Sequence, residues 1–393
     1  MKLQKLFVNF ARYYTHLSAH MEKELRIIIS GGGTGGHIFP AVSIANAIRA
    51  KRPEAKILFV GAEGRMEMQR VPAAGYEIVG LPIQGFDRKN LLKNISVLFK
   101  IMKSRRLARK VILNFRPQVA VGVGGYASGP TLNVAGGMGI PTLLQEQNSY
   151  AGVTNKLLAK QARCICVAYD GMERFFPADR IRFTGNPVRQ SLLENTMTKD
   201  EAIKSFGLQP GKKTILIVGG SLGARTLNDC ILGNLALLRG QSEIQIIWQT
   251  GKFYSAEIQA ELNSKKKPDN LYVADFISDM NAAYAAADLV ISRAGAGSIS
   301  EFCLLGKPVI LVPSPNVSED HQTKNALALV EKDAAIYISD DEARRTLLPE
   351  AINTINNAKK LESLAQNIRL LARPNAAADI ADEVIRLAEA YEK

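Results

Sequence analysis

Three glycine-rich segments follow apolar, strand-like runs, and segments of this kind can bind phosphate groups. They are residues 31–36 (GGGTGG), 122–130 (GVGGYASGP) and 219–223 (GGSLG). Glycine lets the backbone come close to a ligand, and the N–H groups at the start of a following helix can point at an anion. Two diphosphate groups would use all three loops, whereas a tight turn without a ligand is the alternative for each loop alone.

The first loop also fits the GxGxxG pattern of dinucleotide-binding proteins, with glycines at 31, 33 and 36. In those proteins an acidic residue follows about 20 residues further on. Here the first acid after the second strand-like run is Glu63, which comes later. A nicotinamide- or flavin-dependent oxidoreductase is therefore the weaker interpretation of this loop.

Four polar residues near these loops could take part in chemistry. His37 closes the first loop, and its near-neutral pKa suits removal of a proton from a hydroxyl, with a capping or phosphate-contacting imidazole as the alternative. Glu301 comes nine residues after Ser292, where a carboxylate can accept both ribose hydroxyls of a nucleotide. An acid that only complements the helix dipole is the alternative there. Glu146 and Asn148 follow the carboxyl end of a predicted strand, where α/β proteins bind ligands.

The sequence contains neither a DxD motif nor a cluster of histidine and cysteine, so it predicts chemistry without a metal ion or another cofactor. Its four cysteines, at positions 164, 166, 230 and 303, lack CxxC spacing and are expected to be buried, reduced thiols. No run reaches the roughly 18 apolar residues that a membrane-spanning helix requires.

Positive charge is concentrated in the first half of the chain. The net charge is +13, but residues 1–190 carry +17 and residues 191–393 carry −4. Nine basic residues and no acid lie between Arg88 and Lys110. Such an excess suits nucleic acid, an anionic lipid surface or a phosphorylated substrate. This half lacks the interleaved aromatic residues of strand-binding grooves, which argues against nucleic acid.

Alternating β-branched runs and amphipathic segments position these loops, a pattern typical of parallel sheets built from βαβ units. The predicted strands are 25–30, 56–60, 118–123 and 141–145 in the first half, and 214–218, 244–249, 271–276, 288–292 and 308–313 in the second. The helix after the first loop is expected to begin near Phe39 and Pro40, because proline suits a first helical turn. The predicted fold class is α/β, with two Rossmann-like, doubly wound domains facing a cleft.

The same pattern predicts domains at 22–185 and 186–374, joined near residues 184–188 (TGNPV). Residues 375–393, with Asn375 as N-cap, predict an amphipathic helix that could pack on either domain. Residues 1–21 have apolar residues at helical spacing. They are either an interfacial amphipathic extension or a mis-assigned start before Met21.

Several segments together resemble the MurG-type transferases of bacterial peptidoglycan synthesis. They occur in the family's order: GGGTGGHIFPA (31–41), GVGGYASGP (122–130), EQNSYAGVTNKLLA (146–159), GNPVR (185–189), GGSLGAR (219–225), FISDM (276–280), RAGAGSISE (293–301) and DHQTKNA (320–326). The resemblance implies the GT-B fold and an inverting hexosyltransferase. It would move N-acetylglucosamine from UDP-N-acetylglucosamine to the muramoyl 4-hydroxyl of undecaprenyl-diphospho-muramoyl-pentapeptide, converting lipid I to lipid II. The match does not cover the first 20 or so residues, and His321 stands where some relatives have glutamine.

The resemblance also implies roles for individual residues. On the donor side it places Thr34, Gly35, Gly36, Asn148, Arg189, Ser221, Ile277, Ala296, Gly297, Ser298, Glu301 and Gln322. Among these, Glu301 would bind the ribose, the backbone of Ile277 the uracil, and Gln322 the sugar. Around the acceptor diphosphate the two first loops would place Gly33, His37, Gly124, Gly125, Tyr126 and Ser128, with His37 as the candidate base.

The basic segment near residue 100 also predicts contact with a membrane surface. Its apolar residues Leu91, Leu92, Ile95, Leu98, Phe99 and Met102 share one helical face, with Lys93, Lys100 and Lys103 off that face. Such a helix suits shallow docking on anionic lipid, and a stripe that faces the core is the alternative. The expected location is peripheral, at the cytoplasmic face of the inner membrane. The expected partners are UDP-N-acetylglucosamine, lipid I, anionic lipid and neighbouring cell-wall enzymes.

Two rival functions remain open on the sequence. A UDP-sugar epimerase of the same two-domain architecture would use the same nucleotide loop and would not need a membrane-facing helix. A protein without catalysis, either a nucleotide-sugar sensor or a nucleic-acid binder that uses the basic half, is weaker because that half lacks the interleaved aromatic residues of strand-binding grooves.

Overall fold

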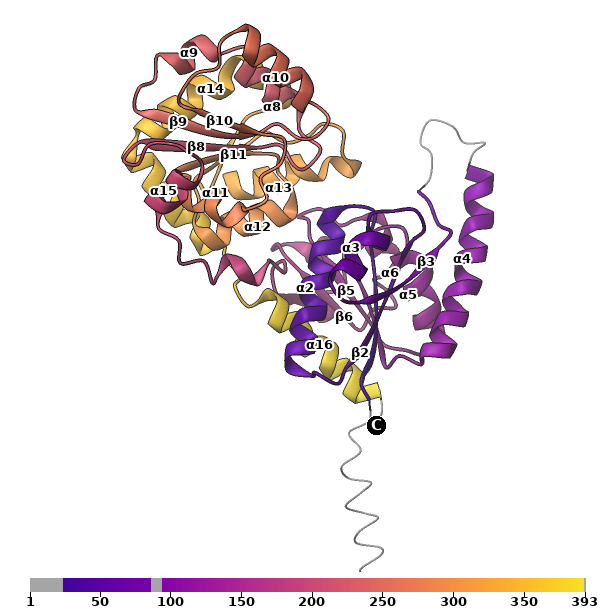
Figure 1. Ribbon diagram of the computed structural model, residues 1–393. Helices are drawn as coiled ribbons and strands as arrows, with labels where there is room; N and C mark the ends of the chain where they lie inside the picture. Colours follow the sequence, from indigo (N-terminus) through magenta and orange to yellow (C-terminus); the bar gives the residue numbers. More distant parts are fainter. Residues whose placement is uncertain (1–23, 86–93, 392–393) are drawn as a thin grey trace, which may run out of the picture.

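The computed structural model describes residues 24–85 and 94–391 and contains two parallel β-sheets, each covered by helices (Figure 1). The first sheet has the order β3-β2-β1-β4-β5-β6-β7, and the second has the order β10-β9-β8-β11-β12-β13. Both are doubly wound, because the strand order reverses beside the first strand of each half. The predicted fold class is confirmed.

The strands of the first sheet are β1 (Arg26–Ser30), β2 (Lys56–Ala62), β3 (Glu77–Leu81), β4 (Val119–Gly122), β5 (Thr142–Glu146), β6 (Cys164–Val167) and β7 (Ile181–Phe183). Those of the second are β8 (Lys213–Val218), β9 (Ile244–Gln249), β10 (Leu271–Ala274), β11 (Leu289–Ser292), β12 (Val309–Leu311) and β13 (Ile336–Tyr337). The central strand β1 pairs with both β2 and β4, so that Ile28 lies beside Leu58 and Ala120.

The helices alternate with the strands along the chain. They are α2 (Gly35–Lys51), α3 (Glu67–Ala73), α4 (Asn94–Phe115), α5 (Ser128–Gly137), α6 (Val153–Leu158), α7 (Lys199–Ser205), α8 (Arg225–Leu232), α9 (Leu235–Arg239), α10 (Ser255–Ser264), α11 (Met280–Ala286), α12 (Ala296–Leu305), α13 (His321–Val330), α14 (Asp340–Asn356), α15 (Ala358–Leu370) and α16 (Ala376–Tyr391). Short 3₁₀ turns lie at Met172–Arg174, Ala178–Arg180, Gln190–Leu192 and Ser318–Asp320.

Each sheet separates two apolar layers, because successive side chains of a strand point to opposite faces. On β1, Ile27 and Ile29 pack in the layer with α2 and α16, whereas Ile28 packs with α4 and α5. On β8, Ile215 and Ile217 face the layer of α8 and α14, whereas Leu216 and Val218 face α11 and α12. Continuous apolar runs with both faces buried are typical of parallel strands.

The last helix returns to the first sheet. α16 lies along α2 although more than 300 residues separate them in the chain (Figure 1). Its apolar face packs in the first domain's core through Ile380 and Val384, and Lys51 pairs with Asp382 at 2.5 Å on the outside. The sequence left open which domain this helix packs on, and in the structure it packs on the first sheet. The domain boundaries at 185 and 374 themselves stay predictions.

Two local expectations differ from the structure. α2 begins at Gly35 rather than near Phe39, so Pro40 lies inside the helix and not in its first turn. The glycine loop continues directly into the helix, because Thr34 already has the extended conformation of an N-cap. Glu301 lies in the second turn of α12, since that helix begins at Ala296, and therefore it is not an acid of the first turn.

The four cysteines are free thiols and are buried, as predicted. Among the described residues, none of the helices is both long and apolar enough to span a membrane.

Candidate functional site

The first two glycine loops touch each other at the carboxyl edge of the first sheet. Gly33 after β1 and Gly124 and Gly125 after β4 all have positive φ, at 87°, 92° and 87°. A Cβ atom built on Gly125 would lie 2.3 Å from the carbonyl oxygen of Gly32. Only glycine allows this approach, so the two predicted acceptor loops form one continuous backbone surface.

His37 lies in the first turn of α2, beside this surface. Its Nδ1 atom is 3.1 Å from the carbonyl oxygen of Gly32 and 3.2 Å from the hydroxyl of Thr34. The carbonyl can only accept, so Nδ1 carries the proton and Nε2 keeps a lone pair. Nε2 points towards the second loop, where a Cβ on Gly124 would lie 2.8 Å from it.

Burial lowers the pKa of His37, and the electrostatic interaction with His321 on α13 lowers it further. The Gly32 carbonyl and the Glu67 carboxylate oppose this effect. The imidazole is therefore neutral at neutral pH, which is the state that a general base requires.

Two further residues of the second loop have different environments. Ser128 is buried, and its single hydroxyl proton is shared between the carbonyl oxygens of Ser30, 2.7 Å from Oγ, and Gly124, 2.9 Å from Oγ. It holds the loop and has no free hydroxyl proton for a ligand. Tyr126 is half exposed and packs its ring against Gly85, where a Cβ atom would meet the ring at 2.3 Å.

Glu146 is buried at the end of β5 and organises the segment that follows. Its carboxylate accepts from the backbone N–H of Asn148 at 3.1 Å, the backbone N–H of Gly152 at 3.0 Å and Nδ2 of Asn155 at 2.9 Å. Burial raises its pKa, and these donors oppose the rise. Glu146 has no bond across to the second domain in the described residues, so it shapes the loop that carries Asn148.

Asn325 of α13 joins this loop to the second domain. Its Oδ1 accepts from the backbone N–H of Ser149 at 2.9 Å, and its Nδ2 donates to Oδ1 of Asn148 at 3.1 Å. Nearby, Nδ2 of Asn186 donates to the hydroxyl of Ser300 at 3.1 Å. These bonds place Asn148, predicted on the donor side, at the junction of the two domains.

On the second domain, Glu301 already has three donors. Its Oε1 accepts from Nη2 of Arg189 at 3.0 Å and from Nε at 3.2 Å, and its Oε2 accepts from the hydroxyl of Tyr284 at 2.7 Å. Burial raises the pKa of Tyr284 well above its usual value, and the charge of Glu301 adds to the rise. The tyrosine therefore stays a donor across the physiological pH range. The family resemblance places Arg189 and Glu301 at the same nucleotide, and the structure brings these two residues together.

The first turn of α12 carries Ala296, Gly297 and Ser298, and the N-cap Gly295 offers no side-chain acceptor to its N–H groups. Such a helix start attracts an anion. Ser221 is exposed in the third glycine loop, whereas Ile277 is buried and its N–H donates to Oε1 of Gln249 at 2.8 Å. A contact of Ile277 with uracil would therefore use its carbonyl.

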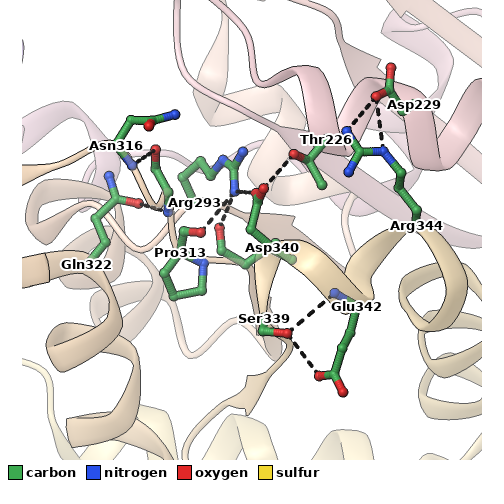
Figure 2. A network of polar contacts seen from close by, with 12 residues as sticks. Thr226, Asp229, Arg293, Pro313, Asn316, Gln322, Ser339, Asp340, Glu342 and Arg344 are labelled. Carbon is green, nitrogen blue, oxygen red and sulfur yellow. Dashed lines mark hydrogen bonds and ion pairs between the residues drawn. The ribbon is translucent and has the colours of Figure 1, made fainter.

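Gln322 belongs to a polar network that joins three loops at this edge (Figure 2). Its Oε1 accepts from the backbone N–H of Ser314 at 2.8 Å. Arg293 is the centre of the network, since its Nη1 donates to the carbonyl oxygens of Val312 and Pro313 at 3.0 Å and pairs with Asp340 at 2.5 Å (Figure 2). The network fixes the loop after β12 against the start of α14.

α4 exposes part of the predicted apolar stripe. Leu98, Phe99 and Met102 are 55%, 69% and 53% exposed, so for these three the alternative of a core-facing stripe is wrong. The core contacts of α4 come from its other side, through Ala108 and Ile112. Lys100 donates to Oε1 of Gln84 at 2.6 Å. Lys103 is exposed, Leu91, Leu92 and Lys93 lie outside the described residues, and the side chain of Ile95 is not described.

Sequence reasoning missed Glu67, Tyr284 and Asn325, whose contacts come from distant segments. Asn325 lies within the quoted segment DHQTKNA, which was its only signal. Among the described residues, no group of three or more histidine, cysteine and acidic side chains could hold a metal ion. A cavity of about 340 Å³ is lined by Ile299, Ser300 and Cys303 of α12 among other residues, and none of the predicted site residues lines it.

Comparisons with known proteins agree with this arrangement. The glycosyltransferase family 28 N-terminal domain matches residues 27–167, and the C-terminal domain of that family matches residues 214–384. A protein of Bacteroides thetaiotaomicron is 69% identical over 94% of this chain and 100% of its own length. It is named UDP-N-acetylglucosamine--N-acetylmuramyl-(pentapeptide) pyrophosphoryl-undecaprenol N-acetylglucosamine transferase.

Solved structures show the same architecture. The crystal structure of Acinetobacter baumannii MurG has a TM-score of 0.74 and 29% identity, and the match covers 92% of this chain and 99% of that one. A UDP-N-acetylglucosamine 2-epimerase from Neisseria meningitidis has a TM-score of 0.65 at 16% identity, covering 92% of this chain and 100% of that one, which shows a shared fold alone. The level of identity to the transferases, over almost the whole length, shows that the chain belongs to the MurG family within glycosyltransferase family 28.

Proposed function

We propose that this chain transfers N-acetylglucosamine from UDP-N-acetylglucosamine to the muramoyl 4-hydroxyl of undecaprenyl-diphospho-muramoyl-pentapeptide, the lipid I to lipid II step of peptidoglycan synthesis. The names of the relatives supply the two substrates. One observation of the structure supports the reaction most directly. A neutral imidazole with a free Nε2 lies in one domain, and the uncapped start of α12 lies in the other.

In the proposed reaction the acceptor hydroxyl oxygen bonds to the anomeric carbon of the sugar as the bond from that carbon to the diphosphate breaks. The hydroxyl proton passes to Nε2 of His37, and the electron pair leaves with UDP. The N–H groups at the start of α12 and the guanidinium of Arg189 stabilise the departing charge. Glu301 binds the ribose, so the ribose hydroxyls compete with Arg189 for Oε1.

The test is the transfer of labelled sugar from UDP-N-acetylglucosamine to lipid I in detergent. We expect His37→Ala to lower kcat by about 10²- to 10⁴-fold, the range of general-base catalysis, while UDP binding persists. Glu301→Ala should mainly weaken donor binding. Glu243→Ala, which removes an exposed acid of the same domain, is the control.

Consumption of UDP-N-acetylglucosamine by the folded protein without transfer to the acceptor would contradict the proposal. It would favour an epimerase or a hydrolase of the same fold.

A second part of the proposal concerns location. The exposed apolar residues of α4, together with its basic residues, support docking on anionic lipid at the cytoplasmic face of the inner membrane. There the chain would meet lipid I and the neighbouring enzymes that make and use such precursors.

Replacing Leu98, Phe99 and Met102 together by serine should reduce cosedimentation with phosphatidylglycerol vesicles by about tenfold or more, because less apolar surface is buried in the lipid. Leu370→Ser, at a residue 79% exposed on α15, is the control. Equal vesicle binding by the triple variant and the wild type would refute docking through α4.

A further inference from the structure

One peptide unit lies between a buried carboxylate and the candidate base. The N–H of Gly33 donates to Oε2 of Glu67 at 2.9 Å, and the carbonyl oxygen of Gly32 is 3.1 Å from Nδ1 of His37. These two groups belong to the same planar peptide bond. Glu67 and His37 are therefore linked through a single amide, although neither touches the other.

The site of Glu67 is built around its side chain. Glu67 is 1% exposed at the start of α3, and its Oε1 accepts from the backbone N–H of Ala62 at 3.0 Å. A Cβ atom on Gly32 would lie 2.2 Å from Oε1, and one on Gly61 would lie 2.6 Å from Cγ. Glycine at both positions leaves the volume that the carboxylate occupies.

Within residues 24–85 and 94–391, Glu67 forms no ion pair. Buried carboxylates are rare unless they are paired, because the charge is costly to remove from water. Two backbone N–H groups donate to its oxygens, and among the described residues no cationic side chain pairs with it. The imidazole of His37 beyond the Gly32–Gly33 peptide interacts electrostatically with this carboxylate.

We propose that Glu67 is a positioning residue for His37, and that it orients and polarises the imidazole through the Gly32–Gly33 peptide. This inference rests on the proposed role of His37 as the base. Hydrogen bonds in a chain strengthen one another, so an anion at the N–H end makes the carbonyl a stronger acceptor for Nδ1–H. The effect increases as Nε2 takes a proton, which is when the base must act.

Among the described residues, two titratable side chains act electrostatically on His37. Glu67 raises the pKa of His37, and His321 on α13 lowers it. Removing the Glu67 charge takes away the raising interaction and leaves the one with His321. The pKa of His37 then falls, and the acid limb of the pH profile of kcat moves to lower pH.

The first test is Glu67→Gln in the full chain, with lipid I transfer followed from pH 5 to 9. We expect kcat to fall by about 10- to 100-fold, a part of the total contribution of a general base, with the KM for UDP-N-acetylglucosamine unchanged. The acid limb should move to lower pH. Glu67→Asp, which keeps the charge, should restore the limb towards its wild-type position. Glu63→Gln removes an exposed acid of the same β2–α3 segment and serves as the control.

A double-mutant cycle separates this role from a merely structural one. If Glu67 acts through His37, then Glu67→Gln should change the residual kcat of His37→Ala by less than twofold. The inference is wrong if the losses of kcat in the two single variants multiply in the double variant. It is also wrong if the Glu67→Gln protein has wild-type thermal stability and an unchanged acid limb. If His37→Ala itself keeps wild-type activity, the base assignment fails first, and the single variant reveals this independently of Glu67.

Discussion

At the scale of single residues, the proposed nucleotide site depends on how the Glu301 carboxylate is held. Arg189 donates to Oε1 and Tyr284 donates to Oε2, so one oxygen is paired with an arginine whose side chain is 45% exposed and the other with a buried phenol. The ring of Tyr284 packs edge-on against Phe302 in the core, which holds its hydroxyl in place.

Tyr284→Phe should therefore raise the KM for UDP-N-acetylglucosamine by about fivefold to tenfold, the equivalent of about 1 kcal/mol for one hydrogen bond. The carboxylate would lose its fixed donor, whereas kcat at saturating donor should change little. Tyr272→Phe, on β10, is the matched control. Steady-state kinetics with varied donor would contradict this role of Tyr284 if both variants gave the wild-type KM.

The sequence supplied His37 and Glu301 because each lies inside a motif whose type and spacing carry chemical meaning. It could not supply Glu67 or Tyr284. Their partners are 34 and 17 residues away, and only the parallel register of the sheets brings them together. A single glutamate in the segment GRMEMQ has no pattern that distinguishes it from a solvent-exposed acid.

At the scale of elements, the two loops proposed to bind the acceptor form one surface because glycine at position 125 removes the side chain that would separate them. The contact is between backbones, so no neighbouring side chain can move aside to relieve a clash. The absence of a side chain at position 125 therefore determines how closely the loop after β4 approaches the loop after β1.

Gly125→Ala should reduce transfer strongly, by about tenfold or more, because the residue has φ of 87° and the added methyl group would meet the Gly32 carbonyl that holds His37. Gly137→Ala is the control, since a Cβ atom there meets nothing within 4 Å. Activity and donor binding measured on both variants check this; wild-type activity in Gly125→Ala would show that the loops can separate.

Strands with long apolar runs were predicted to within a residue or two, because burial on both faces gives an unmistakable pattern. β9 was predicted with the correct ends, whereas β3, β6, β7 and β13 were not predicted. β7 and β13 are sheet edges of three and two residues, so neither a run nor an alternation can develop. β3 is also an edge strand and β6 has only four residues, so neither has a long apolar run. Pro40 misled the prediction of the start of α2 because its preference for the first turn was outweighed by the glycine loop before it.

At the scale of the whole molecule, the first domain is completed by residues from the far end of the described chain. α16 contributes Ile380, Ala381 and Val384 to the core beside β1, and all three are fully buried. Folding of the first sheet is thus coupled to a helix that follows the entire second domain.

Ile380→Ala should lower the free energy of unfolding of the first domain by about 2–4 kcal/mol, the cost of a cavity in a packed core. Leu370→Ala, at a residue 79% exposed, should change it by less than about 0.5 kcal/mol. Urea unfolding followed by hydrogen exchange in β1 measures both, and an unaltered β1 in Ile380→Ala would show that α16 is dispensable for the core.

The return of α16 means that the chain passes between the domains twice, once after β7 and once before α16 (Figure 1). The first passage includes the exposed residues 193–200. A protease that cuts there would leave two fragments, and the second fragment would still carry α16 seated on the first. The nicked protein would remain one particle on a sizing column under native conditions and would separate only in denaturant. The covalent link between the domains is in this sense redundant, so a circular permutant opened at these residues would keep both halves of the site opposed.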